Sequence, residues 1–171
     1  MNSKQNITNT LTINGDPVPT RSSPSWPSLP KVPHVTTPFD NNTFLKSNKK
    51  TTATYRAALA QAIGTSGTIA KIVKMAFGTG GETDSQGNPV PPGDDGNLNT
   101  VVLTKDITAV TYPVATSVAF EATIAAGEFT GSINEVALID ANNRTAAKIR
   151  LLTSKGVDAE SGLNFKWTVE F

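Results

Sequence analysis

Glu135 is the carboxylate in this sequence whose surroundings could give it a special chemical role. It lies in the apolar run Gly-Ser-Ile-Asn-Glu-Val-Ala-Leu-Ile-Asp of residues 131–140. A carboxylate enclosed by apolar residues must find hydrogen bonds or a cation, because an unpaired buried charge is costly. We favour a structural role over catalysis, in which Glu135 accepts backbone N–H groups or pairs with one of three cations, Lys71, Lys74 or Arg150.

Other arrangements that support hydrolysis are missing from the sequence. The chain has no cysteine and a single histidine, His34, so a nucleophile paired with a histidine base is not expected. Glycoside hydrolysis needs two carboxylates that face each other across a cleft. Glu121 and Glu170 fall on the polar faces of alternating segments, and no pattern pairs them with Glu135. The sequence therefore predicts a non-enzymatic structural or binding protein with no cofactor.

Two loop patterns could be read as binding sites. Gly78-Thr-Gly-Gly81 is glycine-rich, but it lacks the lysine of a phosphate-binding loop and no helix follows it. Four acidic residues on the next loop could offer oxygen ligands to calcium, although their spacing does not match a known calcium-binding loop. We do not expect phosphate binding at the first pattern, and we favour solvated acids for the second, which comprises Glu82, Asp84, Asp94 and Asp95.

Glu135 belongs to a predicted β-hairpin. Two apolar runs, residues 131–140 and 145–152, flank the polar turn Ala-Asn-Asn-Arg of residues 141–144. Regular alternation places Val136 and Leu138 on one face and Ile133, Ala137 and Ile139 on the other. Apolar residues on both faces predict a strand inside a sheet.

The rest of the chain after residue 50 also alternates as strands do. Residues 163–171 alternate almost without fault, with Trp167 on the core face. Thr51-Thr52 offers an N-cap for one short helix, residues 52–63, packed by a stripe of Tyr55, Leu59 and Ile63. Further strands are expected at residues 69–77, 101–103, 107–112 and 117–124. In the first of these, alternation places Val73, Met75 and Phe77 on one face and Ile72 and Ala76 on the other. Residues 51–171 are thus predicted to form one mainly β domain, an antiparallel β-sandwich or compact barrel with a short N-terminal helix.

Residues 1–50 predict a long extended N-terminal arm. Seven prolines between residues 17 and 38 exclude a helix or a central strand there. A disordered linker is one interpretation, but linkers rarely carry many large apolar side chains. We favour an arm that docks on neighbouring subunits through Trp26, Leu29, Val32, Phe39 and Phe44, and we take His34 within it as structural.

Composition narrows the classes of partner. The net charge of +1 and the scattered basic residues give no reason to expect nucleic acid. No apolar run is long enough to span a bilayer, and the N-terminus shows no secretion signal. The polar loop at residues 82–99 is unusually long, and loops of that length tend to be functional or mobile.

The order of several segments resembles the N-terminal attachment domain of bacteriophage tail fibre and tail-collar proteins. Lys71-Ile-Val-Lys-Met-Ala-Phe-Gly-Thr-Gly-Gly81 is followed by a variable loop, by residues 103–112 and 117–124, and by Gly127-Glu-Phe-Thr-Gly-Ser-Ile-Asn-Glu-Val-Ala-Leu-Ile-Asp-Ala141. The family carries an "AFGDGG"-like strand end and a later "G…I-x-E-x-G-L-x-D" strand. Here Thr79 stands where an aspartate is frequent and Ala137 where a glycine is frequent.

The resemblance covers about residues 55–152 and implies a structural virion protein at the baseplate of a phage tail or related contractile machine. Such a protein would anchor or link tail fibres, would be made in the host cytoplasm without a signal peptide, and would form a homo-oligomer, with a trimer as the first expectation. Its partners would be other tail proteins. The alternative from a different class is a carbohydrate-binding β-sandwich module that uses the loop at residues 82–99 as its rim.

Overall fold

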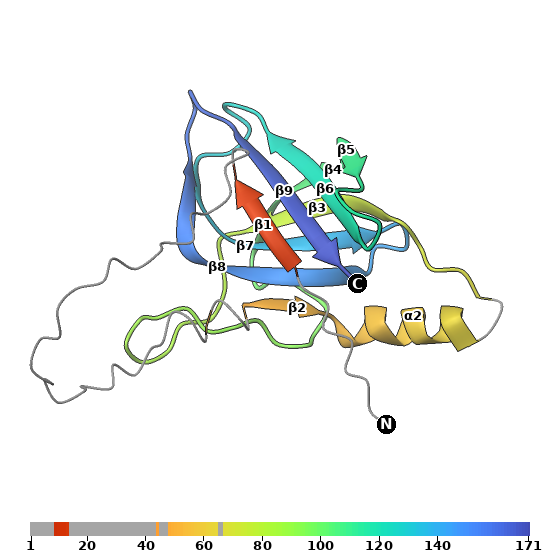
Figure 1. Ribbon diagram of the computed structural model, residues 1–171. Coiled ribbons are helices and arrows are strands. Elements are labelled where there is room, and N and C mark those ends of the chain that lie inside the picture. Colours follow the sequence, from red (N-terminus) through yellow and green to blue (C-terminus); the bar gives the residue numbers. More distant parts are fainter. Residues whose placement is uncertain (1–8, 14–43, 45–47, 65–66) are drawn as a thin grey trace, which may run out of the picture.

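The chain folds into two antiparallel sheets that pack face to face (Figure 1). This computed structural model describes residues 9–13, 44, 48–64 and 67–171. Mainly β structure with one short helix over these residues confirms the predicted fold class, and the sandwich is the form that it takes. The proline-rich part of the expected arm lies outside the described residues.

Each sheet combines strands that are distant in the sequence. The five-stranded sheet has the order β2 (Lys49–Thr51), β8 (Thr145–Val157), β7 (Gly131–Asp140), β3 (Ile72–Gly78) and β4 (Val101–Asp106). The four-stranded sheet has the order β1 (Asn9–Ile13), β9 (Leu163–Glu170), β6 (Ser117–Ile124) and β5 (Ala109–Thr111). The predicted hairpin of β7 and β8 is confirmed, and β9 lies inside its sheet between β1 and β6.

The core lies between the two sheets. Phe77 of β3 and Phe165 of β9 are fully buried, and their ring centroids are 4.7 Å apart. Trp167 is also fully buried, as its place on the core face of the last strand predicts. Burying these large side chains supplies the main favourable free energy that holds the sheets together.

Irregular pairing overturns two of the predicted strand faces. The register of β7 shifts between Ile133 and Glu135, so that Ile133 joins Val136 and Leu138 in the main core. The register of β3 shifts between Ile72 and Lys74 in the same way, and Ile72 packs against the main core instead of sharing a face with Ala76. An extra residue in one strand reverses the alternation beyond it, which regular spacing cannot reveal.

The helix α2 (Ala53–Gly64) forms where the sequence predicts it, but its packing differs. Thr52 caps the helix, with the Tyr55 backbone N–H donating to its hydroxyl at 3.3 Å. Tyr55 and Leu59 are half-buried, whereas Ile63 is 79% exposed. The predicted stripe of three is therefore wrong at Ile63, because α2 extends past the end of the sheets (Figure 1).

Parts of the expected arm belong to the sandwich itself. The backbone of β1 pairs with β9, and β2 pairs with β8, so strands of this fold begin well before residue 51. Phe44 is only 3% exposed and is thus covered within the chain, which differs from the expectation that it docks on a neighbour. Trp26, Leu29, Val32 and Phe39 lie outside the described residues, as does His34.

Candidate functional site: the loop seat on the five-stranded sheet

Glu135 lies on the outer face of the five-stranded sheet, opposite the sandwich core. It is 5% exposed, and its Oε1 accepts a hydrogen bond from the backbone N–H of Thr100 at 3.0 Å. No ion pair of Glu135 occurs within the described part of the chain, although Arg150 stands directly across from it on β8. Burial lowers the pKa of Arg150, and the charge of Glu135 opposes that shift. The carboxylate therefore fixes the end of the long loop in place.

Glycines make room for the Glu135 carboxylate. A Cβ on Gly78 would lie 2.6 Å from Glu135 Oε1, and a Cβ on Gly80 would lie 2.9 Å from the same atom. Gly81 has a positive φ of 100°, and a Cβ there would meet the Arg150 side chain at 2.7 Å. The glycine-rich segment is thus filled by side chains of the protein itself, so it does not form a phosphate cradle.

Arg150 and Asn134 hold the start of the same loop. Arg150 Nη1 donates to the carbonyl oxygens of Gly80 at 2.8 Å and Asn134 at 3.1 Å. The Asn134 side-chain amide donates to the Thr79 carbonyl at 2.6 Å. Both ends of the long loop are therefore anchored to the outer face of the sheet by polar side chains.

Lys148 holds the second half of the loop. Its Nζ donates to Asp95 Oδ1 at 2.6 Å and to the Asn97 carbonyl at 3.1 Å. The Lys148 side chain is 5% exposed, whereas that of Asp95 is 75% exposed. Leu98 packs beside Lys148 and lies on Ala76 and Ala137, in a cluster separate from the main core.

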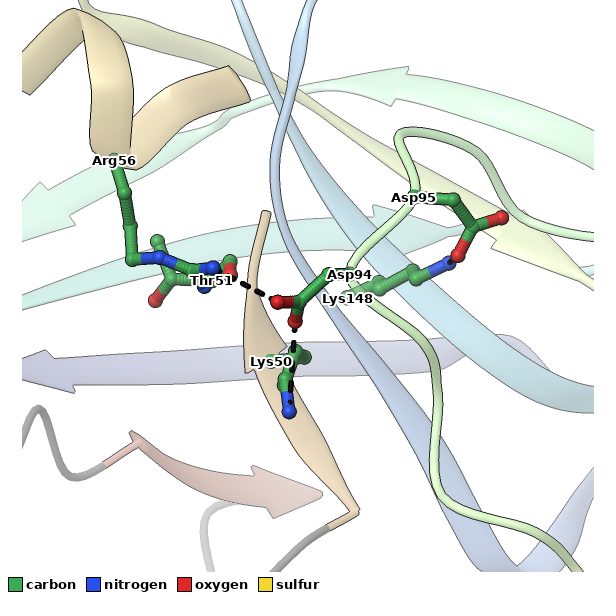
Figure 2. Close-up of polar contacts among 6 residues, drawn as sticks. All are labelled: Lys50, Thr51, Arg56, Asp94, Asp95 and Lys148. Carbon is green, nitrogen blue, oxygen red and sulfur yellow. Dashed lines mark hydrogen bonds and ion pairs between the residues drawn. The ribbon is translucent and has the colours of Figure 1, made fainter. Parts of the chain in front are cut away.

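Asp94 contacts the strand and helix that precede the loop. Its carboxylate lies 3.4 Å from Lys50 Nζ and 2.9 Å from Arg56 Nη2, and its carbonyl accepts from the backbone N–H of Ala53 at 3.2 Å. Arg56 also donates to the Thr51 carbonyl. Figure 2 shows Asp94 directed toward Lys50 and Arg56, and the neighbouring Asp95 directed toward Lys148.

We call residues 94–100 the strap. We call the surface under them the seat, made of Ala76, Ala137 and Lys148, with Lys50 and Arg56 at its margin. Hydrogen bonding to Lys148 lowers the pKa of Asp95, and hydrogen bonding to Arg56 lowers the pKa of Asp94. Both carboxylates are thus held in their charged form by the cations of the seat.

The tip of the loop folds on itself. Asp84 Oδ1 accepts the backbone N–H groups of Gln86 at 2.9 Å and Asn88 at 2.8 Å, and Gly87 has a positive φ of 83°. A hollow of about 280 Å³ lies between the sheet and other parts of the loop, namely residues 81–82, 90–93, 95 and 98–99. Its charged lining comprises Glu82, Asp95, Glu135, Lys148 and Arg150, and none of the described residues that line it is aromatic.

The four acids weighed as calcium ligands have separate roles or positions. Asp84 shapes the tip, Asp94 and Asp95 bind the seat, and Glu82 lines the hollow. No cluster of metal-binding side chains occurs among the described residues. Glu121 forms an ion pair with Lys166 at 2.9 Å on the outer face of the other sheet.

Sequence reasoning did not find Lys148, which alternation could have indicated. Lys148 and Arg150 are two positions apart on a strand, and side chains at that spacing share a face. That face is the one on which Glu135 lies across the hairpin. The partners of Lys148 lie about fifty positions away, so no local pattern names them.

Two comparisons of this chain with known proteins give no match. No protein-family model matches the chain, and no curated protein matches it either. Within the described residues, no helix has both the length and the apolar character needed to cross a membrane.

Proposed function

We propose that this chain is a structural virion protein of a phage or phage-like contractile tail, which anchors or links tail fibres at the baseplate. The observation that carries the proposal is that the two segments behind the resemblance form one structural unit. The glycine-rich strand end and the later Glu135 strand are the neighbours β3 and β7, and Gly78 pairs with Glu135.

The residues of these segments have positional roles. Gly78 and Gly80 leave room for Glu135, which in turn fixes Thr100. Asp140, at the end of the second segment, is fully buried and accepts the backbone N–H groups of Asn142 and Arg144 at 2.9 Å each. Roles of this kind suit a scaffold that holds loops and neighbours, and the proposal assigns no catalysis to them.

The proposed docking element is the proline-rich part of the arm, with Trp26, Leu29, Val32 and Phe39 as its apolar contacts. Phe44 is left out of this set because its side chain is already buried. An extended segment joined to a folded domain adds avidity when it engages a neighbour, since its local concentration is high. We propose a homo-oligomer as the working unit.

A particle experiment tests this function. Antibodies raised against the recombinant chain should detect it in tail particles purified from the producing strain, and deletion of its gene should yield particles without fibres in electron micrographs. Particles that lack the chain, or that keep their fibres after deletion, would contradict the proposal.

A glycan array separates the structural role from carbohydrate binding. Sugar sites commonly use exposed aromatic rings for stacking, and the hollow beside the loop has no aromatic lining within the described residues. We expect no binding on the array. Micromolar binding that disappears when residues 83–89 are replaced by a short Gly-Ser linker would favour an adhesion module.

A further inference from the structure

The seat and the strap fit each other as two separable surfaces. The strap offers two adjacent carboxylates and, three residues later, one apolar side chain, Leu98. The seat offers three cations to the carboxylates and a shallow apolar floor of Ala76 and Ala137 to Leu98. Charge complementarity of this kind selects an extended acidic segment.

The strap makes several contacts with the seat, but for their number they contribute little to stability. The pairs of Asp94 with Lys50 and Arg56 are about half exposed, with side-chain exposures between 44% and 47%, and exposed pairs contribute little. Leu98 is the strap's only buried apolar side chain. It belongs to a cluster separate from the sandwich core, so lifting it leaves the core intact.

Buried charge under the strap also favours its release. Lys148 is 5% exposed because the strap covers it, while its partner Asp95 remains largely in solvent. A buried ion loses much of its hydration, and the attraction of a solvated partner repays only part of that loss. Lys148 regains its hydration when the strap leaves, and this gain offsets the free energy lost with the ion pair.

We propose that the seat is an interaction surface for an extended acidic segment of another polypeptide, and that the chain's own strap occupies it until such a segment displaces it. The matching segment carries two adjacent acidic residues and an apolar residue three positions after the second. It competes for the same three cations, Lys50, Arg56 and Lys148, and for the apolar floor.

A peptide experiment tests the seat directly. The probe is a labelled synthetic peptide of residues 91–101, and the protein is the full chain with Asp94→Asn, Asp95→Asn and Leu98→Ala, which weakens its own strap. We expect this variant to bind the peptide at least about tenfold more tightly than the unaltered chain does, because competition is reduced. No binding to the variant, or equal affinity for both proteins, would overturn the proposal.

Matched controls test the chemistry of the seat. A peptide with the same three substitutions should bind at least about tenfold more weakly, and so should the original peptide when Lys148→Met is added to the variant. Binding that ignores both changes would show that the contact is non-specific and would overturn the proposal.

Hydrogen exchange of the unaltered chain provides a measurement that needs no variant. The Ala53 and Thr100 amides donate to Asp94 and Glu135, so they report on strap release. We expect them to exchange faster than the Val136 amide of the core, and to accelerate about threefold or more between about 50 mM and 1 M salt, since salt screens exposed ion pairs. Exchange of all three amides in parallel at every salt concentration would overturn the proposal.

Discussion

The position of the Glu135 side chain depends on the glycines that surround it. The carboxylate reaches the Thr100 N–H only because Gly78 and Gly80 present no side chain to it. A larger residue at either position would push the carboxylate away from its donor. A buried carboxylate without its hydrogen bond is costly, so the glycines stabilise the loop indirectly.

The substitution Gly78→Ala tests this dependence. Its Cβ would lie 2.6 Å from Glu135 Oε1 and 2.7 Å from the Thr100 carbonyl oxygen, and the backbone atom cannot move freely. We expect a loss of about 1–3 kcal/mol in the free energy of unfolding, measured by urea denaturation. Gly64→Ala is the matched control, because its Cβ meets nothing within 4 Å at the end of α2. Equal stability of the two variants would contradict the close contact.

Asp95 predicts a pH dependence of stability. Its folded-state pKa lies below the ordinary value of 3.8, so the folded chain binds fewer protons than the unfolded chain near that pH. The stabilisation from Asp95 is therefore present above about pH 4 and is lost as the pH falls through the lowered pKa. The difference in unfolding free energy between the unaltered chain and Asp95→Asn should be constant above about pH 5 and should shrink as the pH falls below about 4. Urea denaturation at a series of pH values measures it, and a difference that stays unchanged over the whole acid range would contradict the role of the charge.

Among the elements, β9 carries the largest share of the four-stranded sheet. It pairs with β1 on one side and β6 on the other, and it supplies the fully buried Phe165 and Trp167. Removing it would expose the inner faces of both sheets. By contrast, α2 contributes no fully buried side chain, so the sandwich depends less on it.

Truncation tests the importance of β9. A chain that ends at residue 162 should lack the far-UV circular dichroism and cooperative melting of the full chain. A chain that lacks only Phe171 is the control. Phe171 is 65% exposed and follows the end of β9, so its loss should change the free energy of unfolding by less than about 1 kcal/mol. Cooperative melting of the shorter chain would contradict the central role of β9.

In the whole molecule, the two sheets share one core. Contacts such as that of Phe77 with Phe165 join them, so neither sheet can bury its inner face alone. Small domains with a single core unfold in one cooperative step. The strap is outside this core and is expected to open before the rest.

Coincident unfolding of both sheets is the corresponding prediction. The substitution Trp26→Phe leaves Trp167 as the only tryptophan, so that fluorescence reports on the four-stranded sheet. The urea midpoint from fluorescence should equal the midpoint from circular dichroism, which reports on both sheets. Two separate midpoints would show that the sheets unfold independently.

The sequence by itself determined the class of fold and the approximate positions of the strands after residue 51, but not β1 and β2, which lie within the expected arm. Alternation at residues 117–124 and 163–170 is a local property, because successive side chains of any strand point to opposite faces. The hairpin turn and the Thr52 cap were equally local, since short stretches of chain satisfy their hydrogen bonds. The regular spacing of Tyr55, Leu59 and Ile63 could not show that Ile63 would lie beyond the sheets.

Only the tertiary structure decided which faces are buried and which charges meet. Irregular pairing moved Ile133 and Ile72 to the core, and the contact of Lys148 with Asp95 joins residues 53 positions apart. The register of a strand and the partner of a charged side chain depend on how distant segments of the chain come together. The local spacing of residues does not indicate this. Glu135 thus ties the loop to the sheet through Thr100, a partner 35 positions away that its own strand could not indicate.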